Sequence, residues 1–160
     1  MRIFSLLVLL LIVGCAPEPK VERVAASPGG GSRTGVVGFC QMNKGRKVGD
    51  GQCWALADEA MKSAGRNRPG SHMRVWGRVV HRARETVRAG DIVEFENARF
   101  RDDKMTVITG SHHTAVVMTD ESAGKFVVAE QNFGGGQRVS FREMSLKTHV
   151  SGKVAVYRPG

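Results

Sequence analysis

The chain has 160 residues, of which 41% are hydrophobic and 24% charged, so it can bury one hydrophobic core and is too short for several domains. Its 3 cysteines close at most one bridge, which excludes a disulfide-stapled miniprotein. The 24 lysines and arginines outnumber the 15 aspartates and glutamates. The resulting net charge of +9 favours an anionic partner such as nucleic acid, anionic lipid or a polyanionic wall polymer.

The N-terminus has the features of an export signal. Met1 and Arg2 precede an apolar run over 3–13, which is shorter than the roughly 20 residues that span a bilayer. Residues 12–15, Ile-Val-Gly-Cys, resemble the bacterial lipobox, in which the cysteine receives a lipid and becomes the first mature residue. We therefore predict a lipoprotein signal peptide over 1–15, lipidation at Cys15, and an exported protein anchored in the bacterial cell envelope, facing the periplasm or the exterior. The alternatives are an ordinary signal peptide with a chance cysteine, or an N-terminal anchor.

Residues 16–35 are rich in Pro, Gly, Ser and charge and lack an apolar period, which predicts a flexible linker. The folded domain is then expected over 36–160. Within it, apolar residues recur at helical spacing after Gln52 and predict a helix over 52–64, ended by Gly65. Beyond Pro69 the pattern changes to short strand-like runs separated by turns. These strands are expected at 74–80, 91–95, 105–108, 114–119, 126–131, 138–141 and 153–157. One early helix followed by strands predicts an α+β domain with an antiparallel sheet.

Cys53 lies at the predicted first turn of that helix. A thiol there lies close to the positive end of the helix dipole and to unpaired N–H groups, which favour the thiolate and can bind an oxyanion. Cys53 is therefore a candidate nucleophile. The alternative is an ordinary buried cysteine that packs as a small hydrophobic residue.

A cysteine nucleophile needs a base, and His113 opens the apolar strand that follows. The next strand carries Glu130 and Asn132, which share one face if the strand is regular. One antiparallel register places Asn132 opposite His113, and a shift of two residues places Glu130 there. Either register gives the imidazole a polar acceptor that fixes its tautomer.

Cys53, His113 and the pair Glu130 and Asn132 together resemble the papain-like cysteine peptidase superfamily in its CHAP and NlpC/P60 branch. The resemblance is closer still to the cysteine-proteinase-fold domain that is also found in fungal cortical actin-patch proteins. It rests on several motifs in the same order. These are FCQMNKGRKVGDGQCWALADEA, GDIVEFENARF, GSHHTAVV, AEQN and SGKVAVYRPG.

This resemblance implies a papain-like fold in which a helix carrying the cysteine packs on an antiparallel sheet. It also implies that Cys53, His113, Glu130 and Asn132 correspond to the catalytic set. The N–H of Cys53 and the side chain of Gln52 are expected to stabilise an oxyanion.

The predicted function is an envelope-anchored cysteine amidase or peptidase that hydrolyses amide bonds, with peptidoglycan peptides as the expected substrates. A catalytically silent binding or scaffold module that keeps the fold is the alternative. A toxin or effector amidase is a third option.

Several residues have plainer interpretations. His112 is the rival base, but neighbouring strand residues face opposite sides, and we expect it at the rim. Cys40 either bridges to Cys53 or, as we favour, packs in the core. Glu94 fits the alternation of an exposed strand. No second ligand set accompanies the histidine pair and no nucleic-acid motif accompanies the basic residues, so we expect no metal, no cofactor and no nucleic-acid partner, with the N-terminal lipid attached to a membrane.

Overall fold

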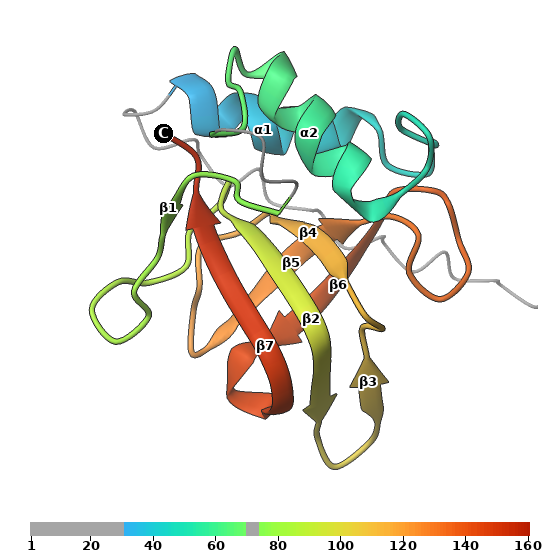
Figure 1. Cartoon of the computed structure of the whole chain (residues 1–160), viewed down its shortest axis with the longest axis vertical. Helices are drawn as coiled ribbons and strands as arrows, with labels where there is room; N and C mark the ends of the chain where they lie inside the picture. Colours follow the sequence, from blue (N-terminus) through green and yellow to red (C-terminus); the bar gives the residue numbers. More distant parts are fainter. Residues whose placement is uncertain (1–30, 70–73) are drawn as a thin grey trace, which may run out of the picture.

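The computed structural model describes residues 31–69 and 74–160, and it is an α+β fold with two helices on one sheet. Helix α1 spans Gly31–Met42 and helix α2 spans Cys53–Ser63. A short 3-10 helix, η1, spans Leu146–Thr148. The strands are β1 (Arg78–Val79), β2 (Ile92–Arg101), β3 (Thr106–Ile108), β4 (His113–Val117), β5 (Lys125–Glu130), β6 (Ser140–Ser145) and β7 (His149–Arg158). In Figure 1 both helices lie across the same side of the curved sheet.

The α2 helix and all of the strands appear near their predicted positions, but α1 was not predicted. Its first residues fall in the range 31–35, which was predicted as linker because the segment 16–35 is rich in Pro, Gly, Ser and charge and lacks an apolar period. The helix is supported by packing. A Cβ added at Gly35 would lie only 3.0 Å from the Cβ of Ala64, so glycine permits the two helices to approach closely. The predicted signal peptide, Cys15 and the rest of the linker lie outside the described residues.

The sheet has seven strands in the order β1-β7-β2-β4-β5-β6, with β3 paired to β2. Only Arg78–Val79 of the strand predicted at 74–80 joins it, at the outer side of β7. In the β4–β5 pair, Val116 lies opposite Ala129 and Val117 opposite Val128. This is the register that, if continued, places His113 opposite Asn132. Strand β5 ends at Glu130, however, so the pairing does not reach that point.

The two faces of the sheet bury separate hydrophobic clusters. The cluster beneath the helices includes Leu56, Trp76 and Val116, together with Cys40 from α1. The cluster on the opposite, concave face includes Phe95 and other apolar residues of β2, β4, β5 and β7. Because side chains alternate along a strand, consecutive residues of β4 contribute to different clusters.

A buried ion pair joins the start of β2 to the end of β7. Arg158 donates from Nε and Nη2 to the two carboxylate oxygens of Asp91, both at 2.8 Å, and Asp91 is fully buried. Glu85 accepts a further bond from Nη1 of Arg158 at 3.1 Å. This pair fixes the last strand of the chain against the centre of the sheet.

We predict that Asp91→Ala lowers the free energy of unfolding by about 3–5 kcal/mol, because it leaves the buried guanidinium of Arg158 without its main partner. Urea denaturation monitored by circular dichroism measures the effect. The matched control is Lys153→Met, which removes an exposed ion pair with Glu96 and is expected to change stability little. Equal losses in the two variants would contradict the assignment.

Candidate active site

A tight turn leads the chain into α2. Gly49 and Gly51 have positive φ angles of 55° and 87°, a conformation that favours glycine. The N–H of Gln52 donates to Oδ1 of Asp50 at 2.9 Å, and Gln52 is the N-cap residue of the helix. Cys53 is therefore the first residue of α2, within the first turn in which it was predicted to lie. Its N–H has no acceptor within the helix, and its thiol lies at the positive end of the helix dipole.

The side-chain amide of Gln131 fastens this turn to the end of β5. Gln131 is fully buried. Its Nε2 donates to the carbonyl oxygens of Val48 and Gln52 at 2.9 and 2.7 Å, and its Oε1 accepts from the N–H of Val48 at 3.1 Å. These three bonds fix the position of the nucleophile relative to the strand that carries Glu130.

The Cys53 thiol contacts the first two residues of β4. Burial by itself would raise the pKa of Cys53, but the hydrogen bond and positive charge of His113 lower it, as do a backbone and a side-chain hydrogen bond with Thr114. The net effect is a thiol pKa below the ordinary value. The geometry thus favours a thiolate next to an imidazolium.

The imidazole of His113 is held from several sides. It is 2% exposed, and its Nε2 is hydrogen-bonded to Oε2 of Glu130 at 3.0 Å. The ring of Phe95 stacks on it with centroids 6.0 Å apart, and the ring of Phe133 lies 5.2 Å away. Burial would lower the pKa of His113, but hydrogen bonds to Cys53 and Glu130 and their negative charges raise it to about 9.

Glu130, and not Asn132, is the residue that orients His113. Glu130 lies diagonally across from His113 in the observed register. Asn132 has a φ of 57° and has left the strand, so the two residues do not share a regular face. Instead, Nδ2 of Asn132 donates to Oε1 of Gln52 at 2.9 Å. Asn132 therefore supports the candidate oxyanion group, and both predicted polar residues lie at the site with different contacts.

A second buried carboxylate, that of Glu94, is linked to Cys53 by Thr114, which contacts both residues. The hydroxyl of Thr114 donates to Oε2 of Glu94 at 2.7 Å, and Nε1 of Trp76 donates to the same oxygen at 3.2 Å. Burial raises the pKa of Glu94 despite these bonds. The interpretation of Glu94 as an exposed strand residue is wrong, because its strand pairs on both sides and this face lies beneath the helices.

The remaining candidates are not among the groups that interact with the Cys53 thiol or the His113 imidazole. Cys40 is fully buried in the core and is a free thiol, as is Cys53, so the two do not form a bridge. His112 is half-buried and is not among the groups that shift the pKa of Cys53. In the parts of the chain that the structure describes, no group of three histidine, cysteine or acidic residues is placed to hold a metal ion.

Three side chains that support the site were not predicted from the sequence. Gln131 and Thr114 lie inside the motifs AEQN and GSHHTAVV, so inspection of each motif residue could have found them. The third, Arg142, donates from Nε to Oε1 of Glu130 at 2.7 Å and from Nη2 to Oε2 at 3.1 Å. Nothing local in the sequence marks it, because its role depends on the pairing of β5 with β6.

Comparison with known families and structures supports the cysteine-proteinase fold. The model of the AIM3/BBC1 cysteine proteinase-fold domain matches residues 34–160. A curated relative is Altered inheritance of mitochondria protein 3 from Debaryomyces hansenii, which is 27% identical over 162 residues. The match covers 88% of this chain but only 17% of the relative, so the chain spans less than a fifth of that protein.

Two solved structures share the fold. The crystal structure of Ly7917 has a TM-score of 0.51 and 16% identity, covering 79% of this chain and 62% of that chain. The crystal structure of Ly7917 with the hydrolyzing product of MDP has a TM-score of 0.52 and 18% identity, covering 80% and 63%. Likeness at this level of identity concerns the fold.

The predicted localisation in a bacterial envelope is wrong in the light of these matches. The curated relative is a yeast protein, and the matching family carries its name. The lipobox resemblance rests on four residues, whereas the family match extends over the whole folded domain. Within residues 31–69 and 74–160, no helix has the length and hydropathy to span a membrane.

We predict that iodoacetamide alkylates Cys53 with a pH midpoint below that of a free thiol, about 8.5, because His113 stabilises the thiolate. The thiolate–imidazolium pair should exist from the lowered Cys53 pKa up to about 9, where His113 loses its proton. Mass spectrometry of the peptide that contains Cys53 measures the rate.

Cys40 is an internal control, because burial raises its pKa to about 12 and it should react only after unfolding. His113→Ala should return the midpoint for Cys53 to the ordinary range. A midpoint near 8.5 in the unaltered protein would refute the thiolate assignment.

Proposed function

The chain belongs to the family of AIM3/BBC1 cysteine proteinase-fold domains, and from its site we propose that it is a cysteine hydrolase that cleaves amide bonds in peptides. The single observation that carries this proposal is the hydrogen-bonded series Cys53, His113 and Glu130. It combines a thiol of lowered pKa with an imidazole of raised pKa. A residue that only packs in the core has no need of such partners.

In the proposed reaction, the Cys53 thiolate attacks the carbonyl carbon of the amide and forms a tetrahedral intermediate. The imidazolium of His113 then gives its proton to the leaving nitrogen, the C–N bond breaks, and a thioester on Cys53 remains. His113, now neutral, takes a proton from water, and the hydroxide attacks the thioester. Release of the acid restores the thiolate and the imidazolium.

In this proposal, groups at the start of α2 stabilise the oxyanion of the tetrahedral intermediate. The N–H of Cys53 lies at the helix N-terminus, where it has no partner within the helix. Gln52 precedes it, and the bond from Asn132 to Oε1 of Gln52 uses the carbonyl side of that amide. The NH2 side of Gln52 is thus available as a second donor to the oxyanion.

We further propose a specific substrate for this hydrolase, namely an amide bond in a peptidoglycan peptide. The net charge of +9 suits a polyanionic polymer. The similar structure of Ly7917 was solved with the hydrolyzing product of MDP, which makes MDP a suitable test substrate.

The second candidate is a binding or scaffold domain that retains the fold. The yeast relative favours this candidate, because its name refers to mitochondrial inheritance and to no hydrolysis. In addition, most of that protein lies outside the matched region. The intact series from Cys53 to Glu130 favours the hydrolase.

We expect the full chain to release new amino groups from MDP or from purified peptidoglycan, and Cys53→Ala to abolish the release. Amine labelling followed by mass spectrometry of the products identifies the bond that is cleaved. Equal release by the Cys53→Ala protein would exclude Cys53 as the nucleophile. Absence of cleavage in the unaltered chain, across both substrates and a pool of unrelated peptides, would favour the binding domain.

We predict that Glu130→Gln lowers kcat by about 10²- to 10⁴-fold, because the carboxylate orients His113 and stabilises its protonated form. Asn132→Ala should cost much less, since Asn132 contacts Gln52 and not the imidazole. Steady-state kinetics on the same substrate compares the two, with thermal melting to verify folding. A loss for Asn132→Ala as large as that for Glu130→Gln would reverse the two assignments.

A further inference from the structure

Arg142 extends the hydrogen-bonded series of the active site by one residue. It projects from β6, where it lies opposite Val128 and therefore diagonal to Glu130 on the same face. His113 is the diagonal neighbour of Glu130 on the other side, from β4. The carboxylate of Glu130 is thus bound between two cations that come from the strands on either side of it.

The contacts of Glu130 divide unequally between these cations. Oε2 is shared by His113 at 3.0 Å and Nη2 of Arg142 at 3.1 Å, whereas Oε1 is bound by Nε of Arg142 at 2.7 Å. The Glu130 side chain is only 1% exposed. A carboxylate buried to this extent remains ionised only when it is paired and hydrogen-bonded, and Arg142 supplies two of the three side-chain bonds.

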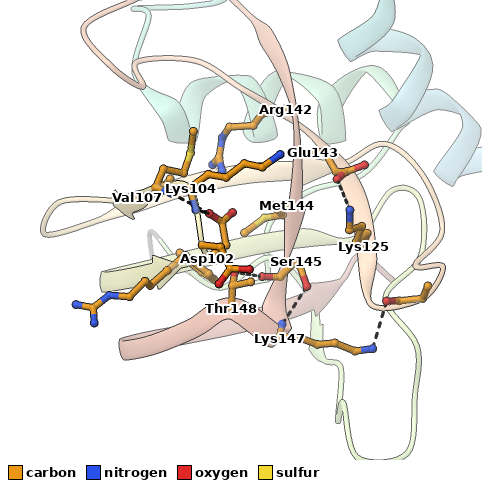
Figure 2. A pocket seen from close by; sticks show the side chains of 15 residues that line it. Asp102, Lys104, Val107, Lys125, Arg142, Glu143, Met144, Ser145, Lys147 and Thr148 are labelled. Carbon is orange, nitrogen blue, oxygen red and sulfur yellow. Dashed lines mark hydrogen bonds and ion pairs between the residues drawn. The ribbon is translucent and has the colours of Figure 1, made fainter.

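The guanidinium of Arg142 is itself fixed. It lies over the ring of Phe133 at 4.6 Å, and Phe133 in turn contacts the ring of His113. Arg142 also lines a cavity of about 720 Å³, where Figure 2 shows it with Lys125 and Glu143. Arg142 therefore contacts the buried carboxylate and also lines the cavity.

We infer that Arg142 is a positioning residue: it keeps Glu130 ionised and aimed at His113, and through Glu130 it maintains the imidazolium that stabilises the Cys53 thiolate. This inference rests on the proposed function of the same site.

A second ion pair between β5 and β6, Lys125 with Glu143, serves as a comparison because it has no contact with the active site. Lys125 and Glu143 also join β5 to β6, at 3.0 Å, but their side chains are 62% and 63% exposed. Their attraction is screened by water and involves no group of the active site. Lys125→Met is therefore a matched control on the same two strands and the same cavity.

The test is the pH profile of Cys53 alkylation in the full chain. In Arg142→Met, the buried Glu130 carboxylate keeps only His113 as a side-chain partner, so its ionised form and the imidazolium that it supports become less stable. The midpoint should then rise by about one pH unit, which slows alkylation about tenfold below the midpoint. Arg142→Lys keeps the charge but not the two-pronged contact and should give a smaller rise of the same sign. Lys125→Met should leave the midpoint unchanged.

A double-mutant cycle shows whether Arg142 acts through Glu130. If it does, adding Arg142→Met to Glu130→Gln should move the midpoint little further. Additive shifts of the alkylation midpoint would overturn the inference. An unaltered midpoint in folded Arg142→Met would also overturn it. If the methionine variant fails to fold, an unaltered midpoint in Arg142→Lys has the same meaning. A free-thiol profile in the unaltered chain would overturn this inference and the proposed function together, whereas a lowered midpoint that is insensitive to Arg142 would overturn the inference alone.

Discussion

The burial of one carboxylate, that of Glu130, is the constraint on which the rest of the site depends. A buried charge must be paired, and Glu130 is paired with His113 on one side and Arg142 on the other. Three neighbouring strands, β4, β5 and β6, each contribute one member of this group. The imidazole therefore takes its orientation from the sheet, while the thiol takes its position from the start of α2.

The division of the molecule into two hydrophobic layers explains how these parts meet. His113 belongs to the concave face of the sheet and Thr114 to the face beneath the helices, yet both contact Cys53. This is feasible because β4 begins at His113 and the first turn of α2 lies at that end of the strand. The site thus occupies the place where the two layers end, and Gln131 joins them there.

Much of this arrangement could be predicted because its signals are local. The helical period after Gln52 is visible in consecutive residues, and Cys53, His113 and Glu130 each lie in a short motif that can be recognised on its own. The choice between Glu130 and Asn132 could not be predicted from register alone. The observed register is the one that favours Asn132, but the chain turns away at that residue, and the diagonal contact from Glu130 replaces the direct one. Helix α1 and Arg142 were missed for a related reason, since both depend on contacts between segments distant in sequence.

The close approach of α1 to α2 at Gly35 has a practical consequence for defining the domain boundary. A recombinant fragment that starts at residue 36, where composition alone places the edge of the folded part, would lack the first turn of a helix that covers the core through Val36 and Cys40. The family match begins at residue 34, which also lies inside this helix. A fragment intended to keep the layer over the nucleophile helix intact should therefore begin before Gly31.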